Sequence, residues 1–269
     1  MVITQKPGGD YMKILVCVKQ VADSESVFEI APEQDRLAFR SNTVWRLNRY
    51  DEYALEEALL LAEKYPDTEI DVISIGPGRA VQAVSRAISL GADNGYHILF
   101  EHEGNIPPHI KGRIISGFAS SKEYDLIFAG VMSEDYGNSS TGPMAAALLN
   151  IPFATHAMKL EPDSSAGTVK VETEIDSRTR YHTVLRLPAL ITFQSGINRP
   201  RYPSLTNVLR SKSYKPSVIN AADLADINAI QNNIRLAKPE TGRKGELHEG
   251  GSAELAEKAL RYFRSKSLL

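Results

Sequence analysis

The chain has 269 residues, enough to bury the core of one large α/β domain, or of one domain with an appendage. Its formal net charge of −2 gives no overall attraction to nucleic acid or to an anionic membrane. No stretch holds the roughly 18 apolar residues that a membrane span needs, and no secretory signal pattern is found. The single cysteine, Cys17, excludes an intrachain disulfide framework and fits a reducing compartment, so we expect a cytoplasmic protein.

The N-terminal half of the chain alternates between short apolar runs and helical patterns. The apolar runs are typical of buried parallel strands and span 13–18, 70–75, 95–100 and 124–129. Helical patterns occur at 51–64, 79–90, 110–121 and 143–149, and a short hairpin is expected between 27–30 and 36–39. This order predicts βαβ units, and hence an α/β fold with a doubly wound, mostly parallel sheet.

The pattern changes from Phe153 onward. Alternating apolar and polar residues at 168–175 and 181–187 predict a late antiparallel hairpin. A buried strand is expected next, at 188–193. The basic, proline-bearing stretch at 198–212 is expected to lead into a short helix. From Lys215 the α/β rhythm is lost, and a polar stretch precedes a final helix at 253–265. We therefore expect an N-terminal extension (1–11), an α/β nucleotide-binding domain (12–214), and an extended C-terminal arm with a helix that packs on a partner subunit (215–269).

The segment Gly130–Gly142 is the first candidate site. It is a Gly/Ser/Asn/Thr loop between a buried strand and a helix, at the sheet edge where ligands of doubly wound folds bind. Free N–H groups and the positive dipole end of the helix favour an anion there, so the loop predicts a phosphate site. An ordinary βα loop, which needs Gly and Ser to turn, is the alternative that the loop alone leaves open.

Side-chain caps are expected at two of these helices. Asn48 or Asp51 suits the start of the helix at 51–64, and Ser140 or Thr141 suits the helix at 143–149. Hydrolase chemistry is disfavoured. The six histidines show no paired metal spacing, and Cys17, on a predicted buried strand, is a poor nucleophile.

Several spaced motifs together identify a family. They are KILVCVKQV (13–21), LNRYDEYALEEA (47–58), ISIGP (73–77) with AISLGAD (87–93), the loop 130–142, and PRYPSLTNVL (200–209). With them the chain resembles the β subunits of electron transfer flavoproteins over nearly its whole length, from Met12 to the final helix. The resemblance implies an adenine nucleotide alpha hydrolase-like fold and a heterodimer with a larger α subunit.

The resemblance also implies an electron carrier rather than an enzyme, because the β subunit itself makes and breaks no covalent bonds. FAD would be held mainly by the α subunit. Acyl-CoA dehydrogenase-type flavin enzymes would donate electrons, and a downstream oxidoreductase or quinone reductase would accept them. The β subunit would hold AMP. In electron-bifurcating members of the family, a second FAD takes the place of AMP.

Site residues follow from the same resemblance. Cys17 and Ile75 would contact the adenine, while the turn at 48–51 would lie beside the base and ribose, and the loop would wrap the phosphate. The cofactor-binding set is Cys17, Asn48, Arg49, Tyr50, Asp51, Ile75, Gly130, Val131, Asp135, Asn138, Ser139, Ser140, Thr141 and Gly142. For Cys17 and Ile75, plain burial in a strand is the alternative.

The loop departs from the AMP-type pattern Asp-Asp-Asp-x-Asn-Gln-Thr-Gly. It reads DYGNSSTG at 135–142, so only Asp135, Thr141 and Gly142 keep their places. Serines donate to a phosphate as amide side chains do, so we expect nucleotide binding, with AMP favoured and FAD left open. A stand-alone nucleotide-binding α/β protein, of the stress-type or ATP-pyrophosphatase-like kind, is the alternative from another class.

The stretch near residue 200 resembles the loop by which the family docks on partner dehydrogenases. Leu205 holds the position of the anchoring leucine, and the docking set is Arg201, Tyr202, Leu205, Val208 and Leu209. An exposed apolar side chain ringed by basic residues suits a partner pocket. A solvated basic loop with Leu205 folded inward is the alternative.

Overall fold

A computed structural model describes residues 11–33, 36–102, 106–176, 179–227, 235–238, 245 and 247–268. Except for Tyr11, the expected N-terminal extension lies outside the described residues. The chain divides into two compact units, Met1–Arg235 and Leu236–Leu269. Over the described ranges, every helix is too short or too polar for a membrane crossing.

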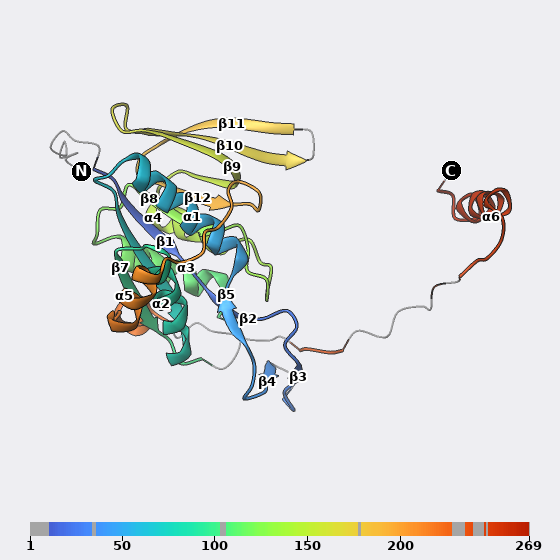
Figure 1. The fold of residues 1–269 in the computed structure, drawn as a ribbon, viewed down its shortest axis with the longest axis horizontal. Coiled ribbons are helices and arrows are strands. Elements are labelled where there is room, and N and C mark those ends of the chain that lie inside the picture. Colours follow the sequence, from blue (N-terminus) through green and yellow to red (C-terminus); the bar gives the residue numbers. More distant parts are fainter. Residues whose placement is uncertain are drawn as a thin grey trace. The chain divides into compact units, whose positions relative to one another are not determined.

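A central sheet organises the first unit (Figure 1). Among the described residues it has nine strands, in the order β11-β10-β9-β12-β8-β1-β6-β7-β13. Their bounds are β1 Lys13–Cys17, β6 Glu69–Gly76, β7 Asn94–Leu99, β8 Leu126–Gly130, β9 Phe153–Asp163, β10 Thr168–Asp176, β11 Thr179–Arg186, β12 Ala189–Phe193 and β13 Ser217–Asn220. From β9 to β13 neighbouring strands run parallel, while β10 and β11 add an antiparallel hairpin at the other edge. The predicted mostly parallel α/β sheet with a late hairpin is confirmed.

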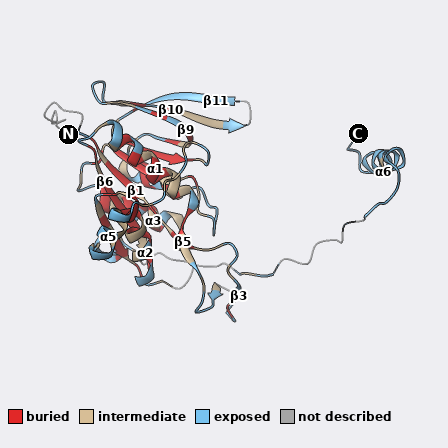
Figure 2. Cartoon of the chain, viewed as in Figure 1, coloured by how far each residue is buried: buried red, intermediate tan, exposed pale blue. Residues whose placement is uncertain are grey.

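Helices cover both faces of this sheet. One apolar cluster joins α1 (Arg49–Lys64) and α2 (Val81–Leu90) to one face, and a second joins α3 (Pro108–Ala119) and α4 (Thr141–Leu149) to the other. Strand β1 serves both clusters because its side chains alternate: Ile14 and Val16 belong to the first and Leu15 to the second. Figure 2 shows the buried positions concentrated in these central strands and helices, whereas β11 is mostly exposed.

Four short strands follow β1 in the chain and form two small sheets of their own. Strand β2 (Gln20–Ala22) pairs with β5 (Trp45–Leu47), and β3 (Phe28–Ile30) pairs with β4 (Leu37–Phe39). The hairpin expected between 27–30 and 36–39 is confirmed. A 3₁₀ turn, η1 (Gly78–Ala80), links β6 to α2, and α5 (Leu205–Ser213) packs against α2.

The C-terminal part differs from the expectation at one point. Ser217–Asn220, placed in the arm by the sequence analysis, forms β13 and pairs with β7. The strand is followed by η2 (Ala221–Asp223) and is too short to show a periodic pattern. In the second unit, α6 (Ser252–Ser265) matches the helix expected at 253–265. Its apolar residues Leu260, Tyr262 and Phe263 are exposed, and its packing on a partner stays a prediction.

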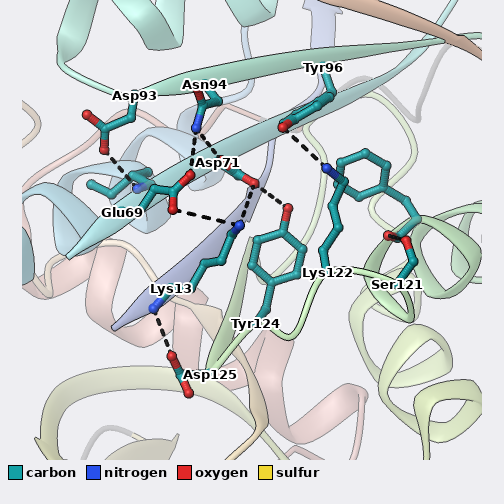
Figure 3. A network of polar contacts seen from close by, with 12 residues as sticks. Lys13, Glu69, Asp71, Asp93, Asn94, Tyr96, Ser121, Lys122, Tyr124 and Asp125 are labelled. Atoms are coloured by element: carbon teal, nitrogen blue, oxygen red, sulfur yellow. Dashed lines mark hydrogen bonds and ion pairs between the residues drawn. The ribbon is translucent and has the colours of Figure 1, made fainter. Parts of the chain in front are cut away.

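The amino ends of the strands carry a closed polar network (Figure 3). The Asp71 carboxylate, fully buried, accepts from the Tyr124 hydroxyl at 2.5 Å and from Asn94 Nδ2 at 2.8 Å. Lys13 Nζ lies 3.9 Å from the same carboxylate, and the Lys13 backbone N–H donates to Asp125. Lys13, Asp71 and Asp125 in this network are therefore each matched by another group of the protein.

Candidate functional site

A cavity of about 680 Å³ opens at the carboxyl ends of β1, β6 and β8. This is the edge at which doubly wound sheets bind ligands. The volume falls in the range of roughly 300–1,000 Å³ that is usual for small-molecule sites. Its walls come from the end of β1, the β6–η1 turn, the first turn of α3, the β8–α4 loop and the β3–β4 hairpin.

The β8–α4 loop brings backbone N–H groups to this cavity. Among the residues that the structure describes, the N–H groups of Ser139, Ser140 and Thr141 donate no hydrogen bond. Ser139 has a positive φ of 50°, and Ser140 follows with right-handed backbone. Such alternation turns successive N–H groups toward one point, an arrangement that binds anions. Because α4 begins at Thr141, the positive end of its dipole adds to the effect.

The predicted side-chain cap of α4 is wrong. Ser140 is the N-cap residue, but neither its hydroxyl nor that of Thr141 caps the helix. The prediction failed because Ser140 has helical backbone rather than the extended backbone of a capping residue. As a consequence, the first N–H groups of α4 stay available to a ligand.

Asn48 holds the loop in place. Its side-chain Nδ2 donates to the Met132 carbonyl at 2.9 Å, and its Oδ1 accepts from the Glu134 N–H at 3.0 Å. Asn48 is the N-cap residue of α1, but its side chain makes no cap bond, so the predicted Asn48 cap is wrong. The side chain is already used by the loop, which lies 84 residues along the chain from Asn48.

Asp51 joins the ends of two strands. Its buried carboxylate accepts from the Lys19 N–H at 2.7 Å and from the Gly130 N–H at 3.0 Å. Burial raises the pKa of Asp51 to about 7, against the lowering effect of these hydrogen bonds. Gly130 must lack a side chain here, since a Cβ would lie 2.5 Å from Asp51 Oδ1 and 2.6 Å from Tyr50 Cβ. This close contact fixes where β8 ends and the loop begins.

Ion pairs secure the acidic part of the loop. Lys19 Nζ lies 2.6 Å from Asp135 and 3.3 Å from the Ser133 hydroxyl. Glu134 pairs with Arg46 at 3.1 Å and with Arg49 at 3.7 Å. The acidic groups of the loop therefore bind the protein's own cations, and they leave the Ser/Thr end of the loop for the cavity.

Basic and aromatic groups complete the walls. The Arg79 guanidinium stacks on Trp45, with Cζ 3.6 Å from the ring centroid, and donates to Gln20 at 2.9 Å. Lys111, in the first turn of α3, also lines the cavity. Burial lowers the pKa of Lys111 to about 8. Burial also raises the pKa of the Cys17 thiol, which keeps it protonated and unreactive.

The structure brings most of the expected nucleotide residues together. The wall includes Cys17, Asp51, Ile75, Gly130, Val131, Asp135, Asn138, Ser139, Ser140, Thr141 and Gly142. Asn48, Arg49 and Tyr50 lie outside it. These three residues do not line the cavity but contact the parts that do. Asn48 and Arg49 bind the β8–α4 loop, and Tyr50 packs against Gly130.

The sequence reasoning missed several wall residues, among them Lys19, Trp45, Arg79 and Lys111. Lys19 could have been identified from the sequence, because it comes two residues after the end of β1 at the ligand edge. Lys111 follows β7 at the same edge, a segment that the sequence analysis did not assign to the site. No sequence motif around Trp45 or Arg79 indicates a binding role, because the two side chains stack on each other only in the folded chain.

The expected docking residues lie around the start of α5. Tyr202 and Leu205 are strongly exposed, at 92% and 76%, Leu209 is also exposed, and Val208 is partly covered. Leu205 is therefore not folded inward. Arg201 differs, because its guanidinium contacts Glu56, which is buried, at 2.9 Å and Glu63 at 2.6 Å. These contacts fasten the segment to α1 and use the charge of Arg201 within the chain.

Comparison with known proteins places the chain in a family. Residues 37–224 match the electron transfer flavoprotein domain. The chain is 34% identical over 248 residues to an electron transfer flavoprotein subunit beta from Bradyrhizobium diazoefficiens, covering 92% of this chain and 97% of the relative. It is 31% identical to the subunit beta from Methylophilus methylotrophus (93% and 97% covered) and to that from Mus musculus (91% and 97%). The chain therefore belongs to the electron transfer flavoprotein family, as a β-subunit member.

Proposed function

We propose that this chain is the β subunit of a heterodimeric electron transfer flavoprotein and that it binds AMP in the cavity at the carboxyl edge of the sheet. The observation that carries the proposal is the cavity wall at 139–141, where unpaired N–H groups meet the N-terminus of α4. A phosphate supplies the acceptor oxygens that these donors lack. Family membership supports a role in electron transfer and, with it, an α-subunit partner.

The residues of the cavity wall fit a nucleotide. The unpaired amides and Lys111 would hold its phosphate, and Cys17 and Ile75 offer an apolar wall to the base. AMP would act as a structural group. The redox chemistry is supplied by FAD, held mainly by the α subunit. The part of this chain is to fix the position of that subunit and to meet the electron donors.

FAD in the same cavity is the second candidate, and one observation favours it. The cavity continues beyond the phosphate loop to Leu37, Phe39 and the stacked pair of Trp45 and Arg79. These flat and apolar surfaces could cover the further rings of a dinucleotide. Such occupancy would move redox chemistry into this subunit and favour an electron-bifurcating role.

The nucleotide content of the purified protein tests the proposal. We would co-express the chain with its α subunit, denature the complex and quantify the released nucleotides. One FAD and one AMP per heterodimer are expected. Two FAD and no AMP would replace the proposal with the second candidate. No nucleotide beyond one FAD would contradict nucleotide binding, and failure to form a complex with the α subunit would favour a stand-alone protein.

We further propose that the exposed segment at 201–212 docks flavin dehydrogenases of the acyl-CoA dehydrogenase type. Leu205 would enter a partner pocket, and the Ser204 side chain, which accepts from the Asn207 N–H at 3.2 Å, presents it on the first turn of α5. Arg201 would serve as the anchor of the segment rather than as a partner contact.

Substitution of the exposed leucine tests the docking role. Leu205→Ala should slow electron transfer from the dehydrogenase by about fivefold or more, since interface anchors cost over about 1 kcal/mol when truncated. Heterodimer formation and nucleotide content should stay intact. Val184→Ala is the matched control, because Val184 is also exposed (61%) but lies on β11. Equal transfer rates for both variants would contradict docking through Leu205.

A further inference from the structure

Three basic residues of the cavity wall, Lys19, Arg79 and Lys111, differ in the partners that their charged groups have within the protein. Lys19 is paired with Asp135 at 2.6 Å. Arg79 is engaged by Gln20 and by the ring of Trp45. Lys111 differs from both: among the described residues, no hydrogen bond, ion pair or ring contact engages its ammonium group. Lys111 is half-buried, and an unpaired cation that is partly withdrawn from water is costly, so its placement in a cavity needs a reason.

The backbone places Lys111 beside the candidate phosphate site. It lies in the first turn of α3, and α3 packs closely on α4. At the next residue, Gly112, an added Cβ would lie 3.1 Å from Met144 Cβ and 3.2 Å from the Ala145 nitrogen. Both contacts are in the first turns of α4, a few residues after the unpaired N–H groups at 139–141. The free ammonium and the free amides thus line the same cavity from two helices that pack on each other.

We propose that Lys111 recognises the phosphate group of the bound nucleotide and makes the site selective for a phosphorylated ligand over the bare nucleoside. Its ammonium forms an ion pair with the anion that accepts from the amides at 139–141. The inference rests on the nucleotide-binding function proposed above, and it names the group that completes that site. Charge-assisted contacts of this kind are shorter and stronger than neutral ones.

The electrostatics of Lys111 agree with this role. Its pKa is lowered to about 8 mainly by burial, and further by the charge of Lys19; Asp135 and Asp51 act in the opposite direction. The remaining ionisable groups on the cavity wall are Cys17, Arg36, Arg79, Glu101, His102 and Tyr136. Cys17 and Tyr136 have raised pKa values, and Asp51, with a pKa of about 7, titrates mostly below pH 8.

A bound phosphate would raise the pKa of Lys111, because it favours the charged ammonium. Affinity for AMP should therefore be full well below pH 8 and fall as the pH rises through about 8, where the ligand-free lysine loses its proton. The phosphate of AMP is doubly ionised throughout this range, since its second pKa is about 6. Adenosine, which has no phosphate, should show no such decline.

The test is calorimetric titration of the heterodimer, stripped of bound nucleotide, with AMP and with adenosine from pH 7.5 to 9.5. Lys111→Met should weaken AMP binding about 10- to 100-fold, the size expected for a lost hydrogen bond to a charged group. It should leave adenosine binding unchanged and abolish the decline above pH 8. Lys111→Arg should keep AMP affinity and also lose the decline, because guanidinium stays protonated.

Arg113→Met is the matched control, because Arg113 lies on the same helix with an exposed side chain, and it should bind AMP as the wild type does. The outcomes separate the two proposals. If wild-type protein binds neither ligand, the proposed nucleotide function fails. If wild type binds AMP and Lys111→Met binds it equally well with the same pH profile, the function stands and the role of Lys111 is overturned. Melting curves of each variant establish that it is folded.

Discussion

The two edges of the parallel sheet carry similar polar side chains and use them differently. At the amino edge, Asp71 contacts Asn94, Tyr124 and Lys13, so these polar groups have partners within the protein (Figure 3). At the carboxyl edge, the amides at 139–141 and Lys111 have no such partners among the described residues and line a cavity of about 680 Å³. A polar group that the protein itself satisfies adds to stability, whereas one left unsatisfied by a cavity indicates a ligand.

The difference arises from the groups that surround the polar side chains at each edge. At the amino edge, burial and the neighbouring Asp71 raise the pKa of Tyr124, so its hydroxyl keeps the proton that it donates. At the carboxyl edge, Asn48 and Asp51 use their polar atoms to hold strand ends and the loop. Because these side chains fix the backbone, the amides of the cavity wall are held in place and keep their N–H groups free. We therefore expect substitutions at the first edge to change stability alone, and those at the second to change binding as well.

The largest effect on stability is expected from Asp71→Ala. It removes the acceptor of Tyr124 and Asn94 inside the sheet edge, and leaving buried partners unsatisfied should lower the free energy of unfolding by about 3 kcal/mol. Chemical unfolding followed by circular dichroism measures the loss. AMP affinity should not change. Asp67→Ala, at an exposed position on the same edge, is the control. A variant that lost AMP binding while keeping its stability would reverse the comparison.

Gly130→Ala should affect both properties. The new Cβ would meet Asp51 Oδ1 and Tyr50, and overpacking of this kind costs about 1–3 kcal/mol. The clash lies at the junction of β8 and the phosphate loop, so AMP affinity should fall with stability. Gly78→Ala at the same sheet edge is the control, since its Cβ would make only an ordinary contact, 3.6 Å from Glu101. Wild-type AMP affinity in Gly130→Ala would argue against this junction as a determinant of the site.

Asn48→Ala should loosen the loop. The variant loses the bonds to Met132 and Glu134, at a cost of about 1–2 kcal/mol in unfolding free energy. Weaker AMP binding should accompany it, with faster hydrogen exchange at the Glu134 amide, which donates to Asn48. Asn42→Ala, at an exposed position before β5, serves as the control. Unchanged exchange at Glu134 would show that Asn48 does not hold the loop.

The smallest effects, about 1 kcal/mol or less, should come from a matched pair of lysines, and their signs should be opposite. Lys13→Met loses partly exposed ion pairs and should slightly destabilise the protein, with AMP affinity unchanged. Lys111→Met removes an unpaired, poorly hydrated charge and should slightly stabilise the nucleotide-free protein. Melting temperatures with and without AMP measure both. Equal signs for the two variants would remove the distinction between the edges.

Sequence patterns predicted the parallel strands β1, β6, β7, β8 and β12 and the two hairpins, because those elements have apolar runs or clear alternation. Strand β13 was not predicted, because its four residues are too few to show a periodic pattern. Strand β9 was not predicted either, because its polar residues, such as Thr155, His156 and Lys159, do not alternate regularly with apolar ones. The position of the 130–142 loop between a strand and a helix, at the ligand edge of the sheet, could be predicted. Its lack of side-chain caps could not, since that depends on the backbone of Ser140.

The rest of the site depends on contacts distant in sequence. Asn48 was expected beside the ligand, but its polar atoms reach a loop 84 residues away. Trp45 and Arg79 meet only because β5 and the β6–α2 turn lie side by side in the fold. Lys111 became prominent only once the partners of Lys19 and Arg79 were known, because its significance is the lack of a similar partner among the described residues.

An experimental structure of the heterodimer purified with its native nucleotide would test the central claim most directly. We predict a phosphate at the N-terminus of α4, within hydrogen-bond distance of the amides at 139–141 and of the Lys111 ammonium. The amino edge should show the same closed network around Asp71 and no ligand. A nucleotide bound elsewhere on this subunit, or a phosphate at α4 with Lys111 turned away from it, would contradict this description of the site.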